Sequence, residues 1–177
     1  TGLPEGWEKV KLGEEFRIKN GKSFKGTFSN NDYDLKVYGS NGIIGDSKDF
    51  NSADSVIIGR VGAYCGSIHY SKERYWATDN TIVVESKEGN LTIEYGFFAL
   101  TGLNLRNFAG GAAQPLLTQN TINSLEVLKP DDKIVKVFSD SVRDSNATIL
   151  NLASQNQRLR ESRDILLPRL MMGMIEV

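Results

Sequence analysis

Cysteine and histidine are scarce in this sequence, with Cys65 and His69 as the single residue of each kind. One cysteine cannot form an internal disulfide, and one cysteine with one histidine cannot supply a structural zinc site. The two side chains stand four residues apart in a segment that the pattern predicts to be a strand, so they are expected to share a face. A Cys–His nucleophile pair is conceivable, but no neighbouring residue suggests an orienting group or an oxyanion hole. We expect Cys65 to be a structural thiol in a cytoplasmic protein.

Long apolar runs are also missing. No run approaches the ~20 residues that a helix needs to cross a bilayer, and residues 1–10 contain no apolar core of a signal peptide. We therefore expect no contact with a membrane. The chain begins with Thr1 instead of Met, which indicates a trimmed start or a piece of a longer protein.

The sequence lacks the usual motifs of cofactor binding and catalysis. The glycine-rich stretch 59–66 does not have the G-x-G-x-x-G spacing, and Gly21-Lys22-Ser23 has Phe16 where a phosphate-binding loop requires its first glycine. The Asn-Pro-Pro-aromatic signature of adenine methyltransferases is missing, and the four prolines include no adjacent pair. We predict no cofactor, no metal and no catalytic residue, so the chain is not expected to be an enzyme.

An excess of positive charge is absent too. The chain has 21 Lys and Arg against 22 Asp and Glu, for a formal net charge of −1, and this counts against nucleic-acid binding, because such domains are usually basic. Local charge matters more than the sum, since salt screens charges beyond ~10 Å. Residues 17–25 hold four cations and no acid. This run predicts either a small basic patch or a solvated loop.

What is present predicts an α+β fold in residues 1–130. The β-branched runs 56–58 and 81–84 favour strands, and Asn41-Gly42 between two apolar runs predicts a hairpin with a type I′ turn. Residues 93–103 are expected to form a short helix, 121–125 a helical turn and 126–128 a strand. We expect a mixed α and β domain with a twisted sheet and short helices.

A different pattern begins at Pro130. Residues 131–169 contain no glycine and one proline, Pro168, and apolar residues follow a seven-residue repeat that predicts one coiled-coil-forming helix of roughly 55 Å within residues 131–177. Pro168 is expected to end or kink it, leaving an apolar tail at 171–177. Asn156 lies in the seam, either as a register-fixing residue or in an exposed seam. The residues predicted to pair with another helix are Val135, Phe138, Val142, Ile149, Leu152, Asn156, Leu159 and Leu166.

Polar and cationic side chains in the predicted turns suit contacts with DNA. Arg bonds guanine edges and Asn or Gln bonds adenine edges, while Lys, Ser and Thr bind phosphates. Arg60 is either a base-contacting residue or a strand residue paired with an acid, and Tyr64 and Trp76 are more often packing residues than stacking ones. The candidate DNA-binding residues are Lys19, Asn20, Lys22, Ser23, Lys25, Ser40, Asn41, Arg60, Tyr64, Thr78, Asn80, Gln114 and Thr118.

The order of short motifs resembles one family over nearly the whole chain, the specificity (S) subunits of type I restriction–modification enzymes. The opening LPEGW at 3–7 and VKLG at 10–13 resemble the start of a target-recognition domain. The remaining motifs are VYGSNGIIG at 37–45, IIGRVG at 57–62, WATDN at 76–80, GGAAQP at 110–115, LEVLKP at 125–130 and RDILLPRLMMG at 163–173.

The resemblance implies a subunit that recognises double-stranded DNA and holds methyltransferase subunits, with motor-nuclease subunits joining for cleavage. Such subunits carry two recognition domains separated by two antiparallel helices, whereas this chain has one domain and one helix. It is therefore either a fragment or a half-subunit that forms a homodimer through its helix. The alternative is a coiled-coil interaction module whose head binds protein and not DNA.

Overall fold

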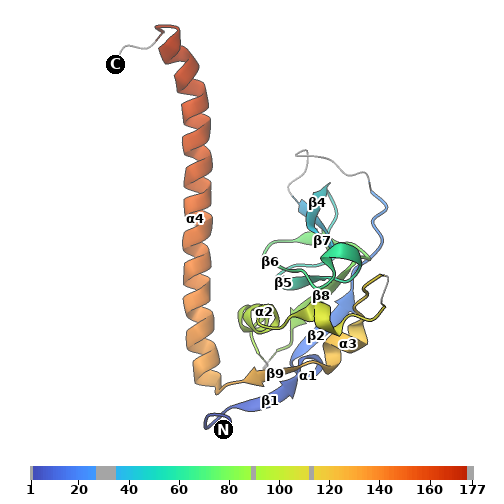
Figure 1. Ribbon diagram of the computed structural model, residues 1–177. Helices are drawn as coiled ribbons and strands as arrows, with labels where there is room; N and C mark the ends of the chain where they lie inside the picture. Colours follow the sequence, from blue (N-terminus) through green and yellow to red (C-terminus); the bar gives the residue numbers. More distant parts are fainter. Residues whose placement is uncertain (1, 27–34, 89–90, 112–113, 175–177) are drawn as a thin grey trace. The chain divides into compact units, whose positions relative to one another are not determined.

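The computed structural model describes residues 2–26, 35–88, 91–111 and 114–174 (Figure 1). The chain divides into two compact units, Thr1–Lys136 and Val137–Val177. We call the first unit the head. No helix in the described part of the chain is both long and apolar enough to span a membrane.

A four-stranded antiparallel sheet forms the centre of the head. Its strands are, in spatial order, β2 (Phe16–Asn20), β8 (Thr81–Ser86), β5 (Ser55–Gly59) and β6 (Ile68–Ser71). Every residue of β5 is buried, as are the first four of β8. Continuous β-branched runs suit strands covered on both faces, and the predicted strands at 56–58 and 81–84 are confirmed.

A second sheet covers one face of the first. It consists of β4 (Gly42–Ser47), β3 (Leu35–Gly39) and β7 (Tyr75–Ala77), in that order, with β3 and β7 parallel. Tyr38, Tyr75 and Ala77 from this sheet pack against Ile57 and Val83 from the central one. The predicted α+β fold is confirmed, and the described residues of the head form three sheets, counting the ribbon described below.

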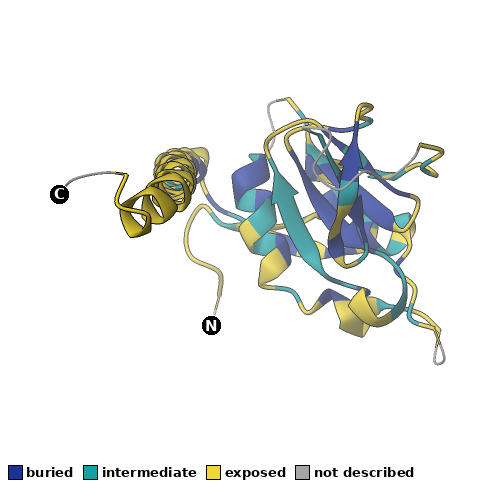
Figure 2. Ribbon diagram, turned by 90° about the horizontal axis from the view of Figure 1, so that it is seen from above, coloured by how far each residue is buried: buried dark blue, intermediate teal, exposed yellow. Residues whose placement is uncertain are grey.

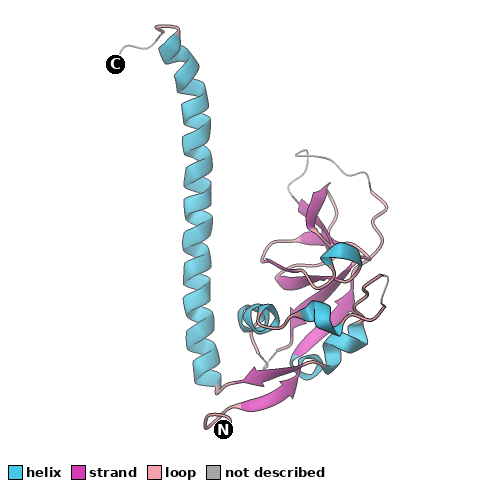
Figure 3. Ribbon diagram, viewed as in Figure 1, coloured by secondary structure: helices cyan, strands magenta, loops and turns pink. Residues whose placement is uncertain are grey.

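Short helices cover the other face of the central sheet (Figure 3). Val56 and Ile58 point to this side, opposite Ile57, because alternate residues of a strand face opposite ways. The predicted helices near 93–103 and 121–125 are confirmed. Figure 2 shows many of the buried residues in the strands. The helices are α1 (Leu12–Glu15), α2 (Ile93–Thr101), the 3₁₀ helix η2 (Leu105–Phe108) and α3 (Gln119–Ser124).

A two-stranded antiparallel ribbon lies where the head meets the long helix. It pairs β1 (Glu8–Lys11) with β9 (Glu126–Lys129), and β9 confirms the strand predicted at 126–128. Lys129 donates to the buried carboxylate of Glu15 at 3.0 Å, and Leu91 N donates to the other oxygen of that carboxylate at 3.1 Å. The bond from Lys129 attaches the last strand of the head to α1, and the bond from Leu91 attaches the segment before α2 to the same carboxylate.

The hairpin predicted around Asn41-Gly42 is confirmed, but its turn type is wrong. A type I′ turn needs a positive φ at both central residues, here Ser40 and Asn41. Neither has one; the left-handed residue is Gly42, with φ 96°. The register also shifts between Val37, which pairs with Gly45, and Tyr38, which pairs with Ile43, so Ile44 is the extra residue of β4.

The long helix α4 spans Asp132–Met171. Asp131 Oδ1 accepts a 2.8 Å hydrogen bond from Lys133 N and so satisfies a backbone donor at the helix start. Of the two expectations for Pro168, that it would end the helix is wrong, because Pro168 lies inside it and Met172 N still donates to Pro168 O. Gly173, with φ 66°, follows the helix end. Residues 175–177 of the predicted apolar tail lie outside the described part.

Candidate nucleic-acid interface

The ends of β3, β5 and β7 and the start of β8 lie together at one edge of the head. β5 and β8 are antiparallel, so Gly59 at the end of β5 pairs with Thr81 at the start of β8. β3 and β7 are parallel and both end at this edge, where Thr78 N donates to Tyr38 O at 3.0 Å. The turns that follow these strands are therefore neighbours, although they lie far apart in the sequence.

Hydrogen bonds between these turns create one surface. The carbonyl of Asn80 accepts from Ser40 Oγ at 2.7 Å and from Arg60 N at 3.0 Å. The segment 115–117 is hydrogen-bonded to the turn after β5, since Gly62 N donates to Pro115 O and Leu117 N donates to Arg60 O. We call residues 40–41, 60–64, 79–80 and 114–118 the loop cluster.

Most predicted residues of the loop cluster reach solvent. Asn41, Asn80 and Gln114 are exposed, and Ser40 and Arg60 are half-buried. Thr118 is exposed, but its hydroxyl accepts from Thr121 N at 3.1 Å and caps α3. The cluster therefore presents amide groups and a guanidinium on a backbone fixed by hydrogen bonds.

Thr78 does not belong to this surface. Its side chain is buried at 4% exposure, and its carbonyl accepts from both the backbone N and the hydroxyl of Thr81. A buried side chain cannot contact a duplex, so the prediction that Thr78 binds DNA is wrong. Its role is to shape the turn between β7 and β8.

Arg60 is not paired with an acid in the described part of the chain. Its Nη1 lies 3.4 Å from the carbonyl of Asp79, and its Nε is buried without a hydrogen-bond partner. Of the two interpretations left open by the sequence, the acid-paired one has no support here. The guanidinium keeps donors for a ligand.

Residues 17–25, the run with four cations and no acid, form the basic segment, and its second half lies at the same edge as the loop cluster. Gly21 N donates to Thr81 O and Lys22 N donates to Ala77 O, which attaches the segment beside the ends of β7 and β8. Lys19 is ion-paired with Glu85 at 2.6 Å and is not a free cation. The other predicted residues of this segment are exposed: Asn20, Lys22, Ser23 and Lys25.

The two aromatic residues weighed in the sequence have different positions. Trp76 packs edge to face on Phe24, with ring centroids 5.5 Å apart, and donates to Lys22 O. The packing interpretation of Trp76 is confirmed. Tyr64 is 60% exposed, so the packing interpretation is wrong for that residue.

Cys65 and His69 do not form a pair on one strand. Cys65 follows the 3₁₀ helix η1 (Gly62–Tyr64) and is buried in the core beneath the helices. His69 lies in β6 opposite Ile57, on the face that meets the second sheet. Burial raises the pKa of the Cys65 thiol, whereas an activated nucleophile needs a lowered one. Among the described residues no cluster of His, Cys, Asp or Glu suits a metal ion.

Sequence reasoning did not identify Arg106. This exposed residue of η2 donates from Nη1 to Ala63 O at 2.8 Å, which places it beside Tyr64 in the loop cluster. A lone arginine between Leu105 and Asn107 gives no pattern that signals such a contact, because the contact depends on how η2 folds against η1.

The predicted seam of α4 is largely exposed beyond the head. Ile149, Leu152, Leu159 and Leu166 keep between 51% and 67% of their surface, while Phe138 and Val142 are half-buried. Val135 packs in the core of the head, so its assignment to the pairing seam is wrong.

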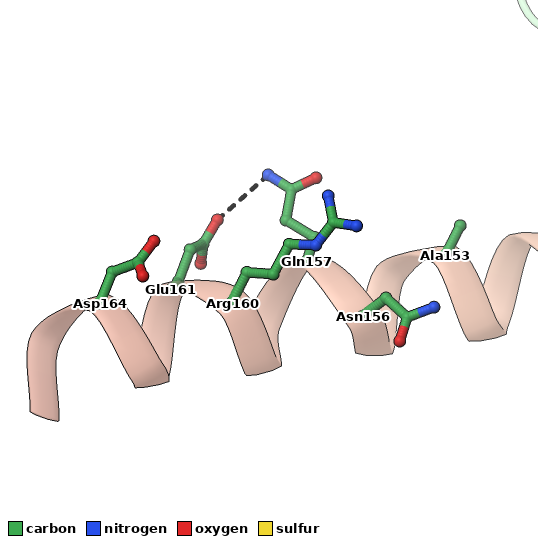
Figure 4. Close-up of a pocket in the computed structure, with 6 residues that line it drawn as sticks. All are labelled: Ala153, Asn156, Gln157, Arg160, Glu161 and Asp164. Atoms are coloured by element: carbon green, nitrogen blue, oxygen red, sulfur yellow. Dashed lines mark hydrogen bonds between the residues drawn. The ribbon is translucent and has the colours of Figure 1, made fainter. Parts of the chain in front are cut away.

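The middle of the same helix is polar. Figure 4 shows Asn156 beside Gln157 and Arg160, and Gln157 donates to Glu161 at 3.1 Å. The apolar seam is thus interrupted by polar residues around Asn156, with leucines on both sides of the interruption.

The fold is that of the S subunits of type I restriction–modification systems. The crystal structure of the S subunit from M. genitalium matches 96% of this chain with a TM-score of 0.80 at 16% identity. The HsdS subunit from Thermoanaerobacter tengcongensis matches the same share with a TM-score of 0.60 at 16% identity. This chain covers 47% and 45% of those two chains.

Sequence comparison defines the family. Residues 4–155 match the type I restriction modification DNA specificity domain, and the chain belongs to this family. It is 29% identical over 131 residues to the Escherichia coli EcoprrI specificity subunit, covering 73% of this chain and 32% of that protein. The Haemophilus influenzae HindI specificity subunit is 36% identical over 67 residues, covering 38% and 15%.

The family assignment does not favour the alternative of a coiled-coil module with a head that binds only protein. The chain spans about a third or less of the curated relatives that it matches and about half of the solved structures.

Proposed function

We propose that the head recognises one half of a split DNA target for a type I restriction–modification complex and performs no catalysis itself. The observation that carries this proposal is the loop cluster, in which Ser40, Arg60 and Asn80 are joined by hydrogen bonds while amide side chains remain exposed. Arg, Asn and Gln are the side chains that make bidentate contacts with base edges. A fixed backbone reduces the ordering cost of those contacts.

Lys22, Ser23 and Lys25 are the proposed phosphate contacts. They are exposed and attached beside the loop cluster, so one duplex lying on that edge could contact both sets of residues. Phosphate contacts orient a protein on DNA without selecting a sequence. With a net charge of −1, affinity is expected to be modest and to fall steeply with salt.

For α4 we propose pairing with another helix through the exposed seam. The seven-residue spacing of Val142, Ile149 and Asn156 continues along the helix with a second row at Leu152, Leu159 and Leu166. Leucines that keep half of their surface in contact with water gain by burial on a second helix. The partner helix belongs to a second copy of this chain if the chain acts as a half-subunit. Phe138 completes the proposed seam.

The further proposed partners are methyltransferase and restriction motor subunits. The matched families of S subunits support this, and one structure that resembles this chain concerns complex assembly of a type I restriction–modification system, with a TM-score of 0.60 at 17% identity. We place the action of the assembled complex on DNA in the cytoplasm.

Selection of bound sequences from a random duplex pool tests the DNA proposal. We expect the chain to enrich one short sequence, whose affinity falls as salt rises. Asn41→Ala and Asn80→Ala should each weaken this binding about tenfold by loss of a base contact. Asn151→Ala, on the surface of α4, is the matched control and should bind as the parent does. Failure to enrich any sequence at low salt would contradict the proposal.

Sedimentation equilibrium tests the helix proposal. The full chain should associate at micromolar concentrations, and Leu159→Asp should make it monomeric by placing a charge in the seam. Ala147→Asp adds the same charge on the opposite side of α4 and should leave association unchanged. A parent chain that stays monomeric would rule out self-pairing.

A further inference from the structure

Tyr64 is an exposed aromatic residue in a polar part of the head. It ends η1 and keeps 60% of its surface in contact with solvent. Other exposed side chains of the loop cluster are the amides of Asn41 and Asn80 and the apolar Leu116. The loop cluster holds no second aromatic residue, and an exposed aromatic ring gains if a ligand covers it.

The turn that carries Tyr64 is held by short backbone hydrogen bonds. Cys65 N donates to Gly62 O at 3.1 Å, Ser67 N to Tyr64 O at 3.0 Å and Gly66 N to Gly59 O at 2.8 Å. The next side chain, Cys65, is 3% exposed and its Sγ donates to Arg60 O at 3.3 Å. The buried thiol anchors the turn and leaves the neighbouring ring outside the core.

Arg106 supports the same turn from η2. Its Nη1 donates to Ala63 O, the carbonyl before Tyr64, at 2.8 Å. Gly66 has φ 88°, and a Cβ there would lie 2.7 Å from Arg106 N, so the two backbones approach closely only because residue 66 is glycine. The turn that presents Tyr64 is thus fixed by both its own hydrogen bonds and an arginine from another segment.

We propose that the Tyr64 ring contacts a nucleobase of the target duplex and that Arg106 is the positioning residue that holds it there. This inference rests on the proposed function of the head. In a duplex, where stacking covers the faces of the bases, a phenol ring suits the methyl group of thymine at the edge of the major groove. The exposed amides of the loop cluster and Arg106 on the same turn favour a nucleic acid over an apolar protein surface, which would need a wider apolar patch.

The test measures binding of the full chain to its selected duplex and to single-base variants by fluorescence anisotropy. Tyr64→Ala should weaken binding to the target about tenfold, since the apolar area of the ring is no longer buried, and should reduce the preference at one base position. The slope of log K against log salt should not change, because no phosphate contact is lost. Tyr64→Phe keeps the ring and should bind as the parent does. Phe50→Ala removes another exposed aromatic side chain, one that lies outside the loop cluster, and is the matched control.

Arg106→Met tests the positioning role. It should reduce the preference at the same base position, and the double variant with Tyr64→Ala should bind no worse than Tyr64→Ala alone, because coupled residues are not additive. If Arg106→Met instead lowers the salt slope by about one, Arg106 is a phosphate contact and its positioning role is wrong.

The outcomes separate this inference from the function on which it rests. If the parent binds a specific duplex and Tyr64→Ala matches it in affinity and preference, the base contact is overturned and the proposed function stands. The same holds if Tyr64→Ala affects only the binding of a methyltransferase subunit. If the parent binds no specific duplex, both proposals fail.

Discussion

The Ser40 hydroxyl donates a 2.7 Å hydrogen bond to the carbonyl of Asn80, which lies 40 residues further along the chain. The bond joins the turn after β3 to the turn before β8, and the same carbonyl also accepts from Arg60 N. One backbone oxygen therefore sets the relative positions of three turns that we propose to bind DNA.

Ser40→Ala should separate these turns slightly. A hydrogen bond of this kind contributes about 1 kcal/mol to stability, so the urea midpoint should fall modestly while target affinity falls more. Ser86→Ala, at the exposed end of β8, is the control. Equal target affinity in Ser40→Ala and the control would show that the bond does not shape the binding surface.

Glu15→Ala should destabilise the head by about 3 kcal/mol, since it leaves the Lys129 ammonium and the Leu91 amide without their acceptor in a partly buried site. The hydrogen bond to Glu15 raises the pKa of Lys129, which agrees with a favourable pair. Urea unfolding measures the loss. Glu88→Ala, an exposed acid, should change stability little.

Stability should fall in mild acid because of His69. Burial lowers the pKa of His69 below its ordinary value of 6.5, and its Nε2 has no hydrogen-bond partner. The folded state therefore favours the neutral ring. The contribution of neutral His69 to the free energy of unfolding is present above pH 6.5 and is lost as the pH falls through the lowered pKa.

Urea unfolding at about pH 7.5 and about pH 5.5 measures this change in stability. Both pH values lie above the range where most carboxylates titrate. His69→Gln should show a smaller decrease between the two pH values than the parent. Because the chain has one histidine, an equal decrease in both proteins would assign the effect to other groups.

Asn156→Leu should strengthen association of α4 and reduce its specificity. A polar residue in a coiled-coil seam fixes register at a cost in stability, and its removal permits other registers or larger oligomers. Sedimentation velocity should show tighter association with a broader distribution of species. A single unchanged species would indicate that Asn156 lies outside the contact between helices.

The elements that sequence reasoning predicted correctly depend on local pattern. The β-branched run at 81–84 favours a strand whatever its pairing register, and the absence of glycine from residues 131–169 permits a helix as long as α4. The loop cluster could be predicted only as a set of residue types. Its geometry depends on the parallel pairing of β3 with β7, and pairing of such short strands leaves no periodic signal.

The wrong predictions also have physical reasons. The sequence between Cys65 and His69 looks extended and therefore predicts one strand. The 3₁₀ helix η1 and the positive φ of Gly66 interrupt it, so only His69 lies in a strand. Pro168 was expected to end or kink α4, but the helix continues to Met171, and the carbonyl of Pro168 still accepts a hydrogen bond from Met172 N. Tyr64 was expected to pack because tyrosines usually do. Its exposure depends on which segments surround it in the fold, and a single sequence does not show them.

The pairing of β1 with β9 places Glu8 opposite Lys129, so the chain enters and leaves the central fold of the head at adjacent points. A domain whose two boundaries are neighbours can be grafted onto a different helical scaffold with little strain at either junction. Exchanging residues 8–129 between related chains should therefore transfer target preference as one unit while the host helix keeps its own associations.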